Sequence, residues 1–260
     1  MMKNGVNNIQ AVSLRSFPAD EVHQAFYKRH GGVSPTPWAS LNHGGMLGDD
    51  PENVVENRKR MLDHFGRPVE SVYDVWQVHS SDIVSTNFPR PLHTPHVKAD
   101  AILTNRPEIT LMMRFADCVP LIFYDPEQRV IGIAHAGWKG TVQKIAQLVI
   151  GRMKEKYGST PRNILAGIGP AIGPGCYEIG SDVLKMVLQA FGKQADDVLR
   201  TRQGKHYFNL WRANQITLIE AGVQAIEVLE ICTACHRDDW YSHRAEQGKT
   251  GRFAALISLI

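Results

Sequence analysis

Five short apolar runs follow one another through the middle of the chain, and they limit what it can fold into. They cover residues 72–78, 83–86, 109–115, 120–124 and 130–135, and each is bounded by Asn, Pro, Asp or Gly. Runs of this length between turn-forming residues are typical of buried β-strands. None approaches the roughly 20 apolar residues that a membrane-spanning helix needs. The pattern therefore predicts a sheet-rich centre and no transmembrane segment.

Helical patterns lie on both sides of these strands. Asp50 suits the N-cap of a helix, Pro51 takes the first helical position, and the apolar spacing continues to an end at Gly66. A second helix is expected over residues 141–157, where apolar residues recur every three or four positions. In the second helix these apolar residues lie on one face.

The rest of the chain continues the alternation of strands and helices. We expect strands at 164–168, 225–231 and 253–260, and helices at 182–191 and 210–221. No internal repeat or linker-length loop divides the chain. With 260 residues, 43% of them hydrophobic, it can bury one large core without help from a metal. The prediction is a mixed α/β fold in one domain spanning residues 1–260.

The charge distribution argues against nucleic acid as a partner. The chain has 29 Lys and Arg against 26 Asp and Glu, a formal net charge of +3, and its basic residues form no clustered stripe. Its first twenty residues contain no apolar run of the length that a secretory signal requires. We therefore expect a cytoplasmic protein that acts on small polar or anionic molecules, with neither nucleic acid nor a membrane as partner.

Three potential metal ligands stand where predicted strands end. Cys118 lies between two apolar runs, just before Pro120, which cannot donate a hydrogen bond to a sheet. His135 and His79 each end an apolar run, and side chains at such positions often point into clefts. Two histidines and one cysteine are the ligand types of an open zinc site, whose fourth position is left for water or substrate.

The spacing of these residues leaves a second interpretation open. They are 39 and 17 positions apart, which matches no short zinc-binding motif. A cysteine nucleophile with a histidine base would use the same residue types. After His135, the turn at 137–140 leads into a helix, and its free amides together with Lys139 form a natural seat for an anion such as phosphate.

Two other motifs are weighed against the functions that they usually indicate. Cys232, Cys235 and His236 form a C-x-x-C-H sequence, which is typical of c-type haem attachment and also occurs in redox and zinc sites. Haem attachment requires export, and a redox C-x-x-C normally follows the first strand of a β-α-β unit, so we expect an incidental loop. The glycine-rich segment 167–173 carries Pro170 where a dinucleotide-binding loop opens its helix, which argues against a Rossmann site.

A series of motifs in a fixed order gives the chain a specific resemblance. In chain order they are GGVS with Leu41-Asn42, GDDPENVVENR, WQVHS, KADAILTN, ADCVPLIFYDP, HAGWKG, GIGPAIGPGCYEIG and the closing TGRFAALISLI. Over nearly its whole length the chain closely resembles the bacterial family variously called YfiH-like, multicopper polyphenol oxidoreductase or laccase-domain proteins. The resemblance implies stacked mixed β-sheets flanked by helices, in an α/β/β/α sandwich.

The resemblance also implies a site and an activity. His79, Cys118 and His135 match the family's metal ligands, usually for zinc, with copper the less favoured ion. Similar proteins phosphorolyse adenosine, inosine, guanosine and methylthioadenosine with phosphate as co-substrate, and also deaminate adenosine, for which zinc would activate water. The candidate substrate-binding residues are Asn42, Arg58, Lys139 and Arg244.

Two residues depart from the family's pattern, and other classes of function stay open. His43 stands where relatives commonly carry an apolar residue, and His243 stands inside a Ser-aromatic-Arg motif, so both departures bear on substrate fit. The alternatives are a Cys-His amidase that edits a peptidoglycan precursor, a copper polyphenol oxidase, and a purine-binding domain without catalysis. The H-x-H pairs of multicopper oxidases are absent from the sequence. We expect a monomer or a weak homodimer.

Overall fold

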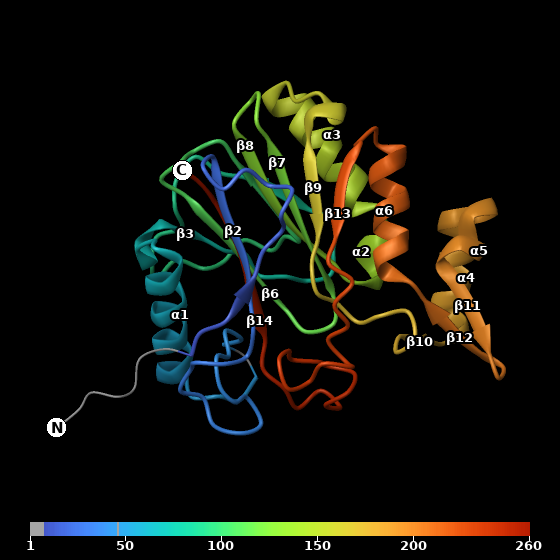
Figure 1. The fold of residues 1–260 in the computed structure, drawn as a ribbon, viewed down its shortest axis with the longest axis horizontal. Helices are drawn as coiled ribbons and strands as arrows, with labels where there is room; N and C mark the ends of the chain where they lie inside the picture. Colours follow the sequence, from blue (N-terminus) through green and yellow to red (C-terminus); the bar gives the residue numbers. More distant parts are fainter. Residues whose placement is uncertain (1–7, 46) are drawn as a thin grey trace.

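Two large sheets form the centre of the fold in the computed structural model, which describes residues 8–45 and 47–260 (Figure 1). The six-stranded sheet has the order β13 (Ala225–Val228), β9 (Leu165–Ile168), β7 (Val119–Asp125), β8 (Val130–Ala136), β5 (Ala101–Thr104) and β4 (Ile83–Ser85). The five-stranded sheet has the order β1 (Ala11–Val12), β2 (Val22–Tyr27), β14 (Phe253–Leu259), β6 (Thr110–Phe115) and β3 (Val72–Tyr73). The predicted sheet-rich centre is confirmed.

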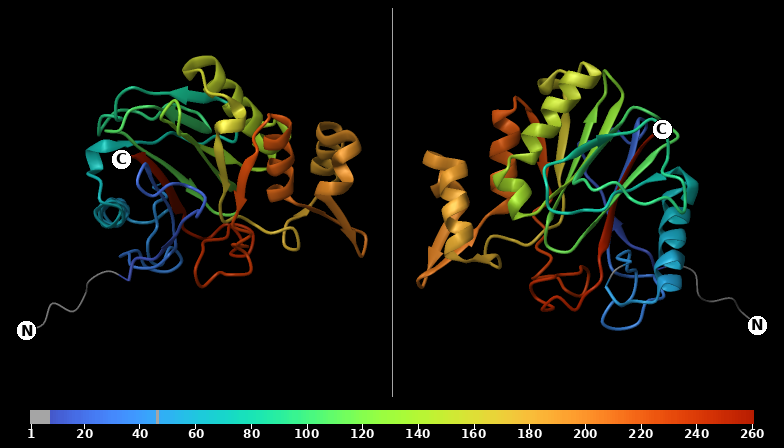
Figure 2. Two further views of the ribbon diagram at one scale, coloured as in Figure 1. Left: turned by 45° about the horizontal axis from the view of Figure 1, so that its top comes forward. Right: turned by 180° about the vertical axis from the view of Figure 1, so that it is seen from behind.

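The two sheets pack face to face, and helices cover their outer faces (Figures 1 and 2). Because side chains alternate along a strand, Leu111 and Met113 of β6 join the core between the sheets, where they meet Ile133 of β8. Met112 points the other way and packs in one cluster with Met61 of α1 (Pro51–Phe65). The opposite outer face carries α2 (Trp138–Val142), α3 (Ile145–Tyr157) and α6 (Leu210–Glu220). The predicted α/β/β/α layering is confirmed.

Helix α1 begins and ends where the sequence predicts. The Asp50 side chain accepts a hydrogen bond from the N–H of Glu52, and Pro51 is the first helical residue. At the other end Gly66 adopts φ 76°, and its N–H bonds back to the carbonyls of Leu62 and Asp63. A residue without a Cβ adopts this left-handed conformation at little cost, which explains the glycine.

Two predicted elements are interrupted. The helix expected over 141–157 is divided into α2 and α3, because Lys144 takes φ 57° and ends the first helix; its ammonium pairs with Glu220 at 3.0 Å. The strand expected over 72–78 leaves the sheet after Tyr73. Beyond that point the Gln77 side chain replaces backbone pairing, since its amide bonds to both the N–H and the carbonyl of Arg114.

Several short strands had no clear signal in the sequence. β1, β2 and β5 were not predicted, and the strand expected over 225–231 ends at Val228. The segment after β9 forms a small third sheet of β10 (Glu178–Ile179), β12 (Lys205–Phe208) and β11 (Leu199–Arg202), accompanied by α4 (Ser181–Phe191) and α5 (Ala195–Val198). This sheet lies to one side of the two large ones, next to α6 (Figure 1). No helix among the described residues is long and apolar enough to span a membrane.

Candidate functional site

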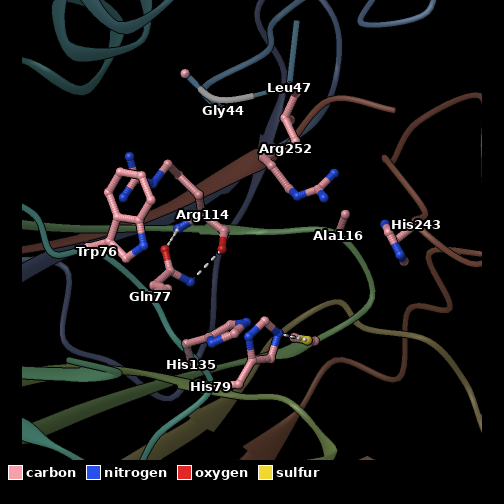
Figure 3. A pocket seen from close by; sticks show the side chains of 12 residues that line it. Gly44, Leu47, Trp76, Gln77, His79, Arg114, Ala116, His135, His243 and Arg252 are labelled. Carbon is pink, nitrogen blue, oxygen red and sulfur yellow. Dashed lines mark hydrogen bonds between the residues drawn. The ribbon is translucent and has the colours of Figure 1, made fainter. Parts of the chain in front are cut away.

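The three predicted ligand residues come together beside the six-stranded sheet. His135 lies near the end of β8, Cys118 directly precedes β7, and His79 lies in the loop between β3 and β4. Their ligand atoms are all within 4.8 Å of one another, with 3.9 Å between Cys118 Sγ and His79 Nε2. Antiparallel pairing of Val119 with Ala136 brings residues that are 17 positions apart to the same place. In Figure 3 the side chains of His79 and His135 lie together at one side of a cavity, whose lining also includes Cys118.

Asp100 holds two of these residues in place. One carboxylate oxygen lies 2.8 Å from His135 Nδ1, and the other accepts hydrogen bonds from the backbone N–H groups of Val78 and Ser80, on either side of His79. Burial would raise the pKa of Asp100, but the hydrogen bonds with His135 and Ser80 outweigh it and lower the pKa below its usual value. An ionised Asp100 accepts a hydrogen bond from Nδ1–H of His135, so Nε2 carries no proton and is free to bind a metal.

Unusual backbone conformations fix the loops that carry the ligands. His79 has φ 60°, and Asp117, the residue before Cys118, has φ 81°, in a region that non-glycine residues rarely adopt. Such conformations persist only where the surroundings stabilise them. The Asp117 carboxylate accepts three hydrogen bonds of 2.6 to 2.7 Å, from Thr233 Oγ1, Ser242 Oγ and the N–H of Arg244.

Gly137 allows the turn after β8 to approach the ligands closely. A Cβ added there would lie 3.0 Å from Cys118 Sγ and 3.0 Å from His79 Cδ2, which is closer than ordinary van der Waals contact. The turn leads into a helix as predicted, but α2 has only five residues and Lys139 is exposed. The glycine is therefore needed for the packing of the ligand residues.

A cavity of about 340 Å³ opens above the three ligands, and it combines apolar and cationic walls (Figure 3). Leu47 and Trp76 supply apolar surface, and Arg114, Arg252 and His243 supply nitrogen atoms. A volume of this size lies at the lower end of the range for small-molecule sites. The walls suit a ligand that has a flat apolar part and a negatively charged part.

The two arginines differ in how far they are already neutralised. The Arg114 guanidinium lies 3.6 Å from the buried carboxylate of Asp74 and donates to the carbonyl of Val75. Arg252 donates only to the carbonyls of Thr250 and Gly251, and no carboxylate of the described residues lies within ion-pair distance of it. Of the two arginines, Arg252 is therefore the one whose positive charge is not already balanced by a carboxylate of the described residues, so it is the better placed to bind an anion.

The four predicted substrate-binding residues lie outside the cavity lining of the described chain. Asn42 is buried and accepts from the N–H of Arg252, so it positions a residue that does line the cavity. The guanidinium of Arg58 lies 3.9 Å from the carboxylate of Asp74 and does not line the cavity. Lys139 lies over the ring of Trp138, and Arg244 lies over the ring of Tyr177. Their part in substrate binding stays a prediction.

The two departures from the family pattern have different surroundings. His43 is fully buried, and neither ring nitrogen has a hydrogen-bond partner among the described residues. Burial and the nearby positive charges of Arg58 and Arg114 lower its pKa to about 3, so the ring is neutral at ordinary pH. His243 is exposed and lines the cavity, where burial and Arg252 lower its pKa.

Sequence reasoning missed Asp100, Arg114 and Arg252. Asp100 directly precedes the unpredicted strand β5, whose Ala101 pairs with Ala134 of β8, beside His135. Recognition of that strand would have placed a carboxylate next to the histidine. The two arginines stand on or beside apolar strands, where no local pattern marks an inward-facing cation.

Comparisons with known proteins bear on this geometry. A family model described as "Multi-copper polyphenol oxidoreductase laccase" matches residues 23–260. The purine nucleoside phosphorylase YlmD of Bacillus subtilis is 36% identical over 248 residues, covering 92% of this chain and 89% of that protein. The purine nucleoside phosphorylase YfiH of Escherichia coli is 32% identical over 233 residues, covering 89% and 91%. A crystal structure of the Bacillus licheniformis hypothetical protein YfiH matches with a TM-score of 0.87 at 35% identity, covering 92% of this chain and 93% of that one.

Proposed function

This chain belongs to the family described as multi-copper polyphenol oxidoreductase laccase, and from that premise we propose that it is a zinc-dependent purine nucleoside phosphorylase. The proposed substrates are adenosine, inosine, guanosine and methylthioadenosine, with phosphate as co-substrate, and adenosine is also deaminated. The observation that carries the proposal is the cavity, because one wall holds the three ligand residues and another holds the unpaired cation of Arg252.

The donor set fits zinc. Two imidazoles and one thiolate with a position open to a cavity are the arrangement of catalytic zinc sites. The carboxylate of Asp100 behind His135 is the outer partner that zinc-binding histidines usually have. Imidazole and thiolate also suit copper, which is the less favoured ion. Zinc bound by His79, Cys118 and His135 would supply Lewis-acid stabilisation of negative charge at this side of the cavity.

The residues of the chain account for the requirements of phosphorolysis. That reaction forms a bond between a phosphate oxygen and ribose C1′ as the bond from C1′ to the purine nitrogen breaks. Arg252, with Arg114 beside it, is placed to hold the phosphate by charge-assisted hydrogen bonds. Leu47 and Trp76 offer the apolar surface that a purine ring needs.

Deamination requires a different placement of the same nucleoside. Water must attack purine C6, whereas phosphate must attack C1′, and these atoms lie at opposite ends of the molecule. We propose that adenosine binds the cavity in two orientations, one for each reaction. Phosphate held by Arg252 would favour the orientation that places C1′ near it, so phosphate should suppress deamination.

Product analysis tests the proposal. Zinc-loaded protein with adenosine and phosphate should release adenine and ribose 1-phosphate, and without phosphate it should release inosine slowly. Release of no base and no inosine, with tight binding of adenosine, would instead indicate a purine-binding domain. Oxidation of a polyphenol by copper-loaded protein, with no nucleoside turnover, would favour the oxidase.

A second candidate function rests on the same cysteine. Burial would raise the pKa of Cys118, but the charge of His135 outweighs it and lowers the pKa to about 6. A thiolate beside an imidazolium is the nucleophile of a Cys-His amidase. Such an enzyme forms an acyl-cysteine intermediate and would be inhibited by zinc. Trapping of an acyl group on Cys118 from a peptidoglycan precursor would replace the phosphorylase proposal.

A further inference from the structure

The other three cysteines of the chain also converge, at a place separate from the cavity. Cys176 lies in the connection between β9 and β10, and Cys232 and Cys235 lie in the connection that follows β13. All three sulfur atoms lie within 4.8 Å of one another, and Sγ of Cys176 is 3.4 Å from Sγ of Cys235. The C-x-x-C sequence, expected to be incidental, thus gains a third cysteine from 56 positions before Cys232.

Pairing of neighbouring strands brings the two segments together. β9 and β13 run parallel side by side (Figure 1), and an isolated bridge pairs Ala171 with Cys232 just beyond their ends. A Cβ added at Gly173 would lie 3.1 Å from Cys232 Sγ, so this glycine allows the closest approach. The cysteines therefore meet because of the sheet topology, as His135 and Cys118 do.

A backbone N–H points at the buried sulfur of Cys232: the N–H of Gly173 donates to it at 3.1 Å. N–H groups that donate to sulfur stabilise the thiolate over the thiol. The C-x-x-C spacing of Cys232 and Cys235 is typical of the ligand pairs of structural zinc sites.

The distances between the sulfur atoms suit a shared metal better than a disulfide. Thiolates bound tetrahedrally to zinc at about 2.3 Å lie about 3.8 Å from one another, and the observed separations of 3.4 Å to at most 4.8 Å bracket that value. A disulfide requires about 2.05 Å. We propose that Cys176, Cys232 and Cys235 form a second zinc site, independent of the site at His79, Cys118 and His135.

The charges and exposure around the cluster agree with such a site. Cys232 is buried and Cys235 is exposed, so the cluster lies at the surface, where a zinc ion can reach it. Three thiolates and one Zn²⁺ carry a net charge of −1. The guanidinium of Arg244 lies over the ring of Tyr177, the residue next to Cys176.

A metal at this place would fasten the two segments that support the catalytic loop. The N–H of Ile172 donates to the carbonyl of Asp117, and Thr233 donates to its side chain. Asp117 is the residue with φ 81° that precedes Cys118. The second zinc therefore has a structural role. It lies outside the cavity, and it restrains the segments whose hydrogen bonds hold Asp117, the residue before Cys118.

Metal content under reducing conditions tests the inference without any assay of turnover. Protein purified in zinc-containing medium should hold about two zinc ions per chain. The Cys235→Ser variant, changed at an exposed position, should hold about one, and so should the matched Cys118→Ala variant of the first site. Combining Cys235→Ser with Cys118→Ala should reduce zinc to a small fraction of one ion per chain.

Cobalt substitution identifies which site is occupied. Cys118→Ala loaded with cobalt should keep a strong thiolate-to-cobalt absorption from the cysteine cluster, and adding Cys235→Ser should abolish most of it. One zinc in the unmodified protein that disappears in Cys118→Ala would overturn the proposal. So would a mass 2 Da below the reduced value with Cys176 and Cys235 joined in freshly prepared, metal-loaded protein, since that result assigns a disulfide.

Discussion

The carboxylate of Asp100 lies 2.8 Å from Nδ1 of His135, and its other oxygen holds the backbone around His79. One residue thereby orients two of the three proposed zinc ligands. We expect Asp100→Asn to weaken zinc binding and nucleoside turnover by about 10- to 100-fold. A neutral amide holds the proton on Nδ1 of His135 less firmly than a carboxylate does, and it makes Nε2 a less basic ligand. Zinc titration against a chelator, alongside phosphorolysis rates, measures both effects.

Asp125→Asn is the matched control for this change. Asp125 is also buried, but it lies at the far end of β7, where it accepts from the N–H groups of Glu127 and Gln128. Its substitution should leave zinc affinity unchanged. Equal losses of zinc in both variants would mean that Asp100 acts only through general stability.

Gly137 provides a steric test of the ligand geometry. Gly137→Ala places a Cβ 3.0 Å from both Cys118 Sγ and His79 Cδ2, so at least one ligand must move. Zinc affinity and turnover should both fall at least tenfold. Gly151→Ala is the control, because the new Cβ in α3 meets nothing within 4 Å and should stabilise the helix by about 1 kcal/mol. An active Gly137→Ala protein with full zinc affinity would contradict the assignment of these ligands.

The role proposed for Arg252 separates the two reactions. Arg252→Gln removes the unpaired cation, so kcat/KM for phosphate in phosphorolysis should fall at least tenfold, about 1.4 kcal/mol of transition-state stabilisation. Deamination of adenosine without phosphate should change far less. Arg202→Gln, on an exposed position of β11, is the control and should alter neither reaction. Equal losses in both reactions would show that Arg252 does not select phosphate.

The two sites predict opposite outcomes for two cysteines. Cys118→Ser replaces a soft thiolate ligand by a hydroxyl and should reduce nucleoside turnover at least tenfold. Cys235→Ser should leave turnover within about twofold of the unmodified protein at moderate temperature, because that sulfur lies outside the cavity lining of the described residues and the hydrogen bonds that hold Asp117 remain without the second zinc. An inactive Cys235→Ser protein that keeps the zinc at His79, Cys118 and His135 would mean that the catalytic cysteine is misassigned.

The parts of the fold that depend on local patterns were predictable from the sequence. The caps of α1 at Asp50 and Gly66 and the apolar strands β6 to β8 were placed to within one or two residues of their observed limits. The three residues proposed as metal ligands were indicated by strand ends, together with a resemblance over most of the chain, and the structure brings their ligand atoms within 4.8 Å of one another. These features depend on residues close in sequence, which periodicity and turn chemistry report.

What depends on pairing between distant strands was not predictable in this way. Asp100 acquires its role because the short strand β5 pairs with β8, and the cysteine cluster forms because β9 lies beside β13. The chain leaves the sheet after Tyr73, and the Gln77 side chain bonds to the backbone of Arg114, 37 residues away. No window of neighbouring residues contains this information.

His43 makes a prediction about stability and pH. Its pKa is lowered to about 3 by burial and by the charges of Arg58 and Arg114, whereas in the unfolded chain it is near 6.5. Between about pH 3 and pH 6.5, His43 is protonated in the unfolded state and neutral in the folded state. This difference makes the free energy of unfolding fall as the pH falls below 6.5. One such proton contributes a slope of at most about 1.4 kcal/mol per pH unit.

Replacing this histidine should therefore make the protein less sensitive to acid. In urea unfolding at pH 4.5, 5.5, 6.5 and 7.5, His43→Leu should lose stability less steeply below pH 6.5 than the unmodified protein, since the apolar side chain has no proton to exclude. His93→Asn is the control: His93 is exposed with φ 74°, a conformation that asparagine tolerates, and the slope should stay unchanged. If His43→Leu keeps the full slope, the acid sensitivity in this range must arise from other histidines whose pKa burial lowers, such as His23 and His243.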